Sequence, residues 1–260
     1  MSTKQETFAT LIKQFEYHFD LRTVFDDFLT MTICAFSRNP LTGESYEEAL
    51  YLTTGGKYKD DELRHLIPRM LASLINEMTE RIESDSGQDI LGEFYEENLY
   101  RKGASQYFTP WPLCTLMAKC AIDTSQEGDL DRPIRIFDPA CGSGRMLLAS
   151  AREAGPDHEY YGTDIDSTCV KMAAINLFLS GMFHSEVMCA NFLDPDDFRF
   201  SYRISFFPFG IFKIEDKEKS PLWNLSKHSL ATKEKVEFKP FNNWSQPATD
   251  SHEGSQLKLF

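Results

Sequence analysis

The sequence lacks an excess of positive charge: 27 lysines and arginines face 40 aspartates and glutamates, which gives a net charge of −13. This deficit argues against a protein coated with basic surface for wrapping nucleic acid, although it leaves room for a local basic groove. No apolar run reaches the length of a membrane span, and the polar start Met1–Glu6 is not a signal peptide. We therefore expect a non-membrane protein of one or two domains.

Cysteine is present, but the spacings that mark disulfides or zinc are missing. The six cysteines form no Cys-x-x-Cys pair and show no zinc spacing with histidine. Reduced thiols in a cytoplasmic protein without a metal site are the simplest interpretation. These residues are Cys34, Cys114, Cys120, Cys141, Cys169 and Cys189.

The stretch 134–148 is the most informative segment of the sequence. It begins with apolar residues typical of a buried strand, passes through a turn containing Gly142 and Gly144, and ends in an apolar helix start. Strand, glycine-rich turn and helix together form the local geometry of a nucleotide-type cofactor site. Asp138 at the end of the strand would repel a phosphate, but it suits a ligand that carries an ammonium group.

Strands alternate with helices after residue 134, which predicts an α/β fold with a parallel sheet. We expect strands at 134–137, 159–163, 185–189 and 202–206. Upstream, apolar residues at three- and four-residue steps predict helices within 1–36, 60–82, 90–99 and 111–122, with Pro68 kinking or splitting the second. The predicted organisation is a helical domain at 1–103, a core at 104–212 and a polar, loosely structured tail at 213–260.

Asp164 is the second acidic candidate for the cofactor site. It follows Gly144 by about 20 residues, at the end of the next strand, where a carboxylate can bind a ribose diol. The alternative is that Asp164 caps the following helix, although Asp166 is better placed to do so. Phe192, after the third strand, is either a stacking partner for an adenine ring or part of the core.

Several of these segments together resemble one family. The run Asp138–Gly144 is similar to the S-adenosylmethionine (SAM) loop of N6-adenine DNA methyltransferases, and most of all to the modification subunits of type I restriction systems. The segment Gln106–Pro110 resembles a motif upstream of that loop, and Asp89–Glu96 resembles the helix before it. The resemblance covers roughly residues 89–212 and implies a Rossmann-like methyltransferase fold, SAM as cofactor and DNA as substrate.

The resemblance also implies roles for individual residues. Asp138 would lie near the amino group of SAM, Asp164 would hold the ribose hydroxyls, and Asn191 would contact the adenine amino group, with Phe192 packed on that ring. The implied cofactor-binding set is Phe108, Thr109, Pro110, Asp138, Pro139, Ala140, Gly142, Gly144, Asp164, Asn191 and Phe192.

The catalytic motif departs from the family pattern. The family ends its fourth strand with Asn or Asp followed by Pro-Pro and an aromatic residue, whose oxygens accept hydrogen bonds from the adenine amino group. The matching residues are Phe206, Phe207, Pro208 and Phe209, so Pro208 and Phe209 keep the pattern while Phe206 has no side-chain acceptor. Two functions follow as alternatives: an adenine-specific DNA methyltransferase of restriction-modification type, or a SAM-binding but catalytically impaired DNA-associated or assembly subunit.

Further partners are expected as well. A specificity or completing subunit is one, because family members continue with more strands than this chain contains. The sliding clamp of DNA polymerase is another, because Gln256, Leu257, Leu259 and Phe260 resemble the terminal peptide that many bacterial proteins insert into it. The alternative for this peptide is an accidental apolar end of a polar tail.

Clamp docking predicts a pull-down that depends on the last residue. Immobilised sliding clamp should retain the full chain and lose it after deletion of Phe260, because that ring is one of the apolar groups offered to the groove. Retention that survives the deletion would contradict docking through this peptide.

Overall fold

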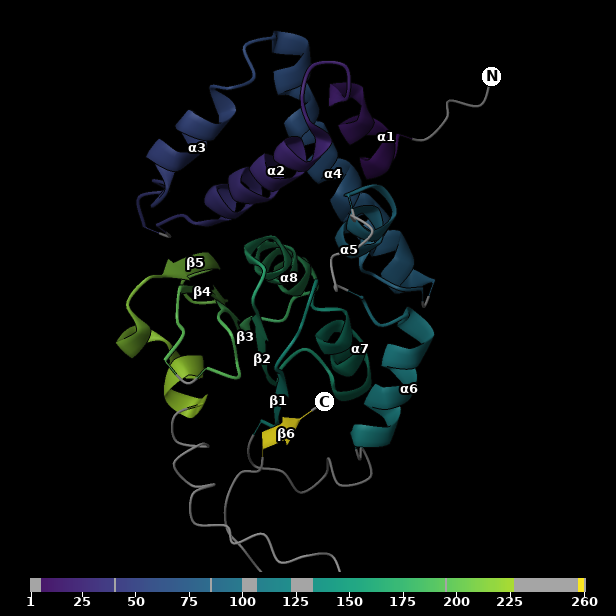
Figure 1. The fold of residues 1–260 in the computed structure, drawn as a ribbon, viewed down its shortest axis with the longest axis vertical. Helices are drawn as coiled ribbons and strands as arrows, with labels where there is room; N and C mark the ends of the chain where they lie inside the picture. Colours follow the sequence, from purple (N-terminus) through teal and green to yellow (C-terminus); the bar gives the residue numbers. More distant parts are fainter. Residues whose placement is uncertain are drawn as a thin grey trace, which may run out of the picture.

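The computed structural model describes residues 6–39, 41–84, 86–99, 107–122, 133–194 and 196–226, together with the backbone of 257–259. Its centre is a six-stranded sheet in the order β5-β4-β3-β2-β1-β6. Helices α7 and α8 lie against this sheet, and the N-terminal helices stack beyond α8 (Figure 1). The expected fold class, an α/β fold with a parallel-rich sheet and an N-terminal helical part, is confirmed.

The sheet is mixed, with a parallel centre. Strands β1, β2 and β3 run parallel, and β6 pairs with β1 in the same direction at the outer edge. Strands β4 and β5 form an antiparallel hairpin beside β3. The strands are β1 Arg135–Asp138, β2 Glu159–Asp164, β3 His184–Cys189, β4 Phe200–Ser205, β5 Gly210–Ile214 and β6 Leu257–Leu259. Gln256 and Phe260, from the predicted clamp peptide, lie outside the described residues.

The expected fourth strand exists, but a parallel direction for it is wrong. Ser205 at the end of β4 pairs with His184 at the start of β3, so the two strands run in opposite directions. The physical reason is the short connection 190–199, because a parallel neighbour needs a crossover of about a dozen or more residues. The C-terminal end of β4 therefore lies at the end of the sheet where β1 and β2 begin, opposite the end where they finish.

The expected helices are present. Aspartates cap four of them: Asp20 begins α2, Asp60 begins α4, Asp89 begins α5 and Asp166 begins α8, each accepting a backbone N–H. The helices are α1 Phe8–Ile12, α2 Leu21–Phe36, α3 Glu48–Gly55, α4 Asp61–Glu83, α5 Ile90–Phe94, α6 Trp111–Ala121, α7 Arg145–Ala154 and α8 Ser167–Leu179, with a π-helical turn at Tyr95–Leu99. Of these, α3 was not predicted.

Pro68 does not split α4, which continues through it as one helix. Proline removes one backbone N–H and leaves the carbonyl four residues earlier without its helical partner. Pro68 and Arg64 both lie on the exposed side of α4, where water can bind that carbonyl. Among the described residues, no helix is both long and apolar enough to cross a membrane.

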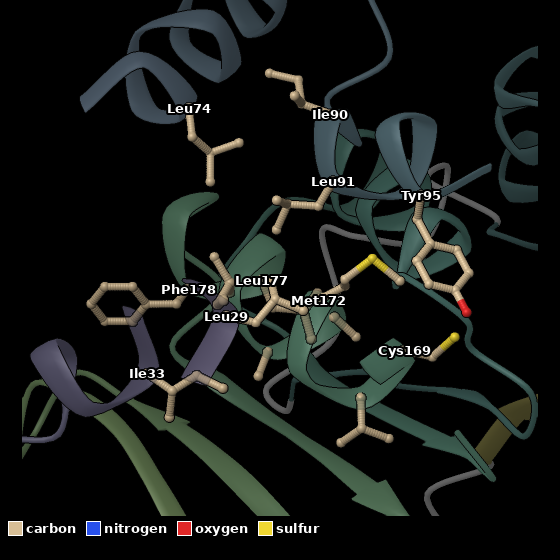
Figure 2. Packing of buried hydrophobic residues seen from close by; sticks show 14 of the residues in the cluster. Leu29, Ile33, Leu74, Ile90, Leu91, Tyr95, Cys169, Met172, Leu177 and Phe178 are labelled. Atoms are coloured by element: carbon tan, nitrogen blue, oxygen red, sulfur yellow. The ribbon is translucent and has the colours of Figure 1, made fainter. Parts of the chain in front are cut away.

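One hydrophobic core joins the N-terminal helices to the sheet. Figure 2 shows Leu29 of α2, Leu74 of α4 and Leu91 of α5 gathered around Met172 and Leu177 of α8, and all five side chains are buried. Helix α8 is apolar around most of its circumference because it lies between the N-terminal helices and the sheet. The helical part therefore forms its core with α8.

A second, smaller core covers the opposite face of the sheet. Phe137, Tyr161 and Met188 from the three central strands pack there with Leu222 and Trp223. Residues 221–226 are helical, and β5 occupies the segment before them. The prediction of a loosely structured tail is therefore wrong for residues 213–226. In this segment, a few apolar residues within a polar sequence cover one face of the sheet. Residues 227–256 lie outside the described part.

Gly210 fixes the start of β5 and yields a stability prediction. Its φ is +150°, and a Cβ added there would lie 2.1 Å from the backbone oxygen of Phe36. We expect Gly210→Ala to lower the free energy of unfolding by about 2 kcal/mol or more, because the backbone of residue 210 or of Phe36 must shift to relieve this contact. In the control Gly155→Ala, φ is +97° but nothing lies within 4 Å. For this control, urea unfolding should show a loss of only about 1–2 kcal/mol in the free energy of unfolding. Equal losses for the two variants would contradict the steric argument.

Candidate functional site

The glycine turn lies at the carboxyl ends of β1 and β2. Asp138 ends β1 and Asp164 ends β2, so the two carboxylates meet at one edge of the sheet. The Gly142 N–H donates to Asp164 Oδ2 at 2.9 Å, and the Cys141 N–H donates to the Thr163 carbonyl at 2.9 Å. These two bonds fix the turn against β2.

Two glycines are required by the shape of this turn. Gly142 has a φ of +54°, and a Cβ there would lie 2.5 Å from the Phe108 ring. Gly144 has a φ of +86° and begins α7, with Ala173 of α8 directly behind it. Positive φ angles favour glycine, and the missing side chains allow Phe108 and α8 to approach the turn closely.

The turn borders a cavity of about 250 Å³. Six of the predicted cofactor-binding residues line it: Phe108, Thr109, Asp138, Ala140, Gly142 and Asp164. Pro110, Pro139 and Gly144 lie within two residues of these along the chain and do not line the cavity themselves. Gln106, from the upstream motif, lies outside the described residues.

Asn191 and Phe192 are not brought to this cavity. The Asn191 carbonyl oxygen Oδ1 accepts a hydrogen bond from the Leu193 N–H at 3.1 Å. The Phe192 ring packs on Phe137 with ring centroids 5.0 Å apart, as part of the second core. The core interpretation of Phe192 therefore describes its place in this structure.

Asp138 is electrostatically unusual. Burial, assisted by the nearby charge of Asp164, raises the pKa of Asp138 to about 6, although the Ala140 N–H stabilises its carboxylate. Burial likewise raises the pKa of Asp164, whose two oxygens accept hydrogen bonds from the backbone N–H groups of Gly142 and Asp166. A raised carboxyl pKa means that the charged form lacks a compensating cation, which a bound ammonium group would supply.

The same residues fit the polar groups of SAM. Asp138 offers a half-buried carboxylate to the ammonium group, and each Asp164 oxygen retains lone pairs for ribose hydroxyls. Three buried thiols also line the cavity, from Cys114, Cys141 and Cys169. Burial raises the pKa of Cys114 to about 11 and raises the pKa values of the other two, so these thiols stay protonated near neutral pH.

A buried ionic network behind the turn was not predicted. Arg145, the first residue of α7, donates from Nε to Asp89 Oδ2 at 2.8 Å and from Nη2 to Glu96 at 2.9 Å. Its Nη1 donates to the Thr109 carbonyl at 3.1 Å, and its guanidinium lies over the Phe108 ring, 5.6 Å from the centroid. Arg145 thus connects the upstream motif to the helix at 89–96.

Asp89 is the centre of this network and is completely buried. Besides Arg145, it accepts hydrogen bonds from the Ser143 hydroxyl at 2.5 Å and from the Asn176 amide at 2.8 Å. A signal was available in the sequence: a cation in the first turn of a helix is unfavourable there and calls for acidic partners elsewhere. The spacing could not indicate which acids, because Asp89 is far from Arg145 along the chain.

The predicted catalytic residues lie elsewhere. Phe206, Pro208 and Phe209 form the turn between β4 and β5, at the sheet edge opposite Asp138 and Asp164. They therefore do not lie beside the cofactor turn, because β4 runs antiparallel to β3. Phe209 packs instead on Phe178 of α8, with centroids 5.0 Å apart.

Comparison with known proteins identifies similar chains. A family model described as N-6 DNA Methylase matches residues 86–243. The methylase subunit of the type I restriction enzyme MpnII from Mycoplasma pneumoniae is 28% identical over 107 residues, which cover 40% of this chain and 19% of that protein. The MjaVIII methylase subunit from Methanocaldococcus jannaschii is 29% identical over 130 residues, or 47% of this chain and 21% of that protein.

A solved structure is also similar, although distantly. The methyltransferase subunit of a type I restriction-modification system from Streptococcus thermophilus has 15% identity and a TM-score of 0.34, covering 73% of this chain and 57% of that one. The matches to the two curated relatives span about a fifth of the length of those proteins.

The buried network predicts a large effect of Arg145 on stability. Arg145→Leu leaves the fully buried Asp89 without its cation, so the free energy of unfolding should fall by about 3–5 kcal/mol. Arg81→Leu is the matched control: Arg81 also bonds a carboxylate, Glu93, and a backbone carbonyl, but it is 30% exposed. We expect a loss of only about 1 kcal/mol for the control. Comparable losses in urea unfolding would contradict a special role for Arg145.

Proposed function

The chain belongs to the N-6 DNA methylase family, and on this premise we propose that it binds SAM and transfers a methyl group to N6 of adenine in DNA. We propose further that it serves a restriction-modification system in the cytoplasm, with DNA as substrate and a specificity or completing subunit as partner. The observation that supports this most is Asp138, a carboxylate with a raised pKa beside a glycine turn.

The proposed roles follow from the cavity lining. Asp138 binds the ammonium group of SAM, Asp164 accepts hydrogen bonds from the ribose, and Phe108 and Thr109 line the methionine end. Gly142 lets the protein backbone of the turn pass close to the cofactor. When bound, SAM supplies an electrophilic methyl group on a sulfonium centre. The protonated thiols around the cavity are then poor competitors for that methyl group, because the thiolate is the nucleophilic form.

A second candidate is a SAM-binding subunit that transfers no methyl group by itself. It is favoured by the position of the Phe206–Phe209 turn, which lies at the sheet edge opposite the cavity. In the sequence, no Asn or Asp is followed by Pro-Pro. The exocyclic nitrogen of adenine is a weak nucleophile and needs hydrogen-bond acceptors to localise its lone pair. A chain that lacks these acceptors beside the cofactor can bind SAM but transfers its methyl group poorly.

Cofactor binding has a predicted pH dependence. The ammonium group should lower the pKa of Asp138 in the complex, so the ligand binds the deprotonated form. Affinity for S-adenosylhomocysteine, measured by calorimetry, should therefore be full above pH 6 and fall by up to about tenfold per pH unit below it. Asp138→Asn should weaken binding about tenfold or more at pH 7.5 and remove most of this dependence.

The control for that titration is Asp157→Asn, which removes an exposed acid from the opposite edge of the sheet. It should leave both the affinity and the pH profile of S-adenosylhomocysteine unchanged. Absence of any binding heat, or the same loss in both variants, would refute the proposed cofactor site.

A transfer assay separates the two candidates. With tritiated SAM and DNA of mixed sequence, we expect the chain alone to incorporate methyl groups about 10²–10³-fold more slowly than an enzyme with its full set of acceptors. Phe206→Asn combined with Phe207→Pro should not raise this rate, because the turn lies at the opposite edge. Incorporation at this slow rate or faster supports the methyltransferase, whereas binding of SAM without any incorporation supports the second candidate.

A further inference from the structure

Tyr107 places an exposed aromatic ring at the rim of the cavity proposed for SAM, which we call the cofactor cavity. Tyr107 is one of the residues that line this cavity, and yet it is 86% exposed. Its ring therefore lies at the opening of the cavity and not in the interior. The roles proposed for the other lining residues leave Tyr107 without an assignment.

The chain that follows Tyr107 is held firmly in place. The Phe108 ring packs against Gly142 so closely that a Cβ there would lie 2.5 Å from it, and the Arg145 guanidinium lies 5.6 Å from the ring centroid. The next carbonyl, that of Thr109, accepts a hydrogen bond from Arg145 Nη1 at 3.1 Å. A ring carried by a fixed backbone loses little conformational entropy when a ligand packs on it.

Among the described residues, two aromatic side chains line the cofactor cavity, those of Tyr107 and Phe108. The Phe108 ring is half-buried and already packs against Gly142, Arg145 and the Tyr95 ring, whose centroid is 6.0 Å away. Tyr107 is therefore the aromatic residue of this cavity with most of its ring area open to solvent.

The proposed reaction needs a flat surface for the acceptor base. An enzyme that acts on a base in DNA holds that base out of the stack, commonly against an aromatic or apolar side chain. The base must come to the opening of the cofactor cavity, because the methyl group is held inside. The rings of the Phe206–Phe209 turn cannot serve, since they lie at the opposite end of the sheet.

The charges around the cavity favour contact through the base over contact through phosphates. Asp138 and Asp164 line it, and the Arg145 guanidinium there is already paired with Asp89 and Glu96. The whole chain carries a net charge of −13, which repels the DNA backbone. A base is uncharged, and its face stacks on an aromatic ring without a cation.

We propose that Tyr107 stacks on the adenine that accepts the methyl group, at the opening of the cofactor cavity. This inference rests on the proposed methyltransferase function and deepens it, because it assigns the acceptor side of the same site. The family pattern assigned this role to Phe209, which the fold carries to the other end of the sheet. Tyr107 binds and orients the base through its ring, so its hydroxyl is not required.

The test uses an oligothymidine that carries one 2-aminopurine, a fluorescent isomer of adenine whose emission falls when an aromatic ring stacks on it. The full chain, with S-adenosylhomocysteine in excess, should quench this emission. Tyr107→Ala should remove most of the quenching and weaken oligonucleotide binding about tenfold, because base–aromatic stacking is lost. Tyr107→Phe should keep both, because the ring is retained.

Tyr17→Ala is the matched control, because Tyr17 is 91% exposed and does not line the cofactor cavity. It should leave quenching and oligonucleotide affinity unchanged, which excludes non-specific contact with any exposed tyrosine. The variants at both positions change exposed side chains, so each should keep its melting temperature. Tyr107→Ala should also keep its affinity for S-adenosylhomocysteine, because the ring lies outside the cavity interior.

The salt dependence distinguishes stacking from phosphate contacts. Binding through phosphates weakens steeply as salt is added. Quenching by stacking should persist or increase, because salt screens the repulsion between an acidic chain and the DNA backbone. Loss of quenching on addition of salt would therefore contradict the proposal.

Three further results would overturn it: no quenching by the unchanged chain, equal quenching by Tyr107→Ala, and an equal loss of S-adenosylhomocysteine affinity in that variant, which would assign the ring to the cofactor. Calorimetry on the same samples judges the cofactor site separately. Normal binding of S-adenosylhomocysteine without quenching refutes only the role of Tyr107, whereas absence of binding heat refutes the cofactor site. The titration is also run without S-adenosylhomocysteine, so that it decides the role of Tyr107 in either case.

Discussion

The ion pair between Asp89 and Arg145 is the contact on which the rest of the site depends. Both side chains are buried, so each charge needs the other: a lone buried charge costs several kcal/mol, whereas the pair with its additional hydrogen bonds is stable. The pair joins α5 of the helical part to the first turn of α7. The helical part therefore belongs to the cofactor site structurally, since it supplies the anion that holds the glycine turn in place.

The direction of the strands sets a second constraint. Parallel strands bring Asp138 and Asp164 to one edge, and the antiparallel β4 carries its turn to the other edge. The two edges then differ in character. One carries a small cavity with two half-buried carboxylates that suits a cofactor, and the other carries the exposed aromatic rings of the Phe206–Phe209 turn. A short connection between β3 and β4 is enough to produce this separation.

Local features of the sequence predicted much of the fold and part of the site. The strand, turn and helix at 134–148, the cap at Asp166 and the strand ending in Asp164 depend on near neighbours, so their residues could be identified without a structure. The direction of β4 and the partners of Arg145 depend on contacts between distant segments. Leu222 and Trp223 were missed for a related reason: two apolar residues in a polar segment carry no period, yet they cover one face of the sheet.

The raised pKa of Asp138 connects stability with function. A carboxylate that is buried beside another acid destabilises the folded protein at neutral pH, because its charged form is better solvated in the unfolded chain. Packing alone would favour a neutral residue at this position. The turn and the Arg145 network keep the carboxylate in place despite that cost. A cationic ligand therefore binds favourably, because it supplies the opposite charge that the folded protein does not place beside Asp138. The rigid network and the destabilised acid thus act together: the first preserves the shape of the cavity, and the second gives it a preference for a positively charged ligand.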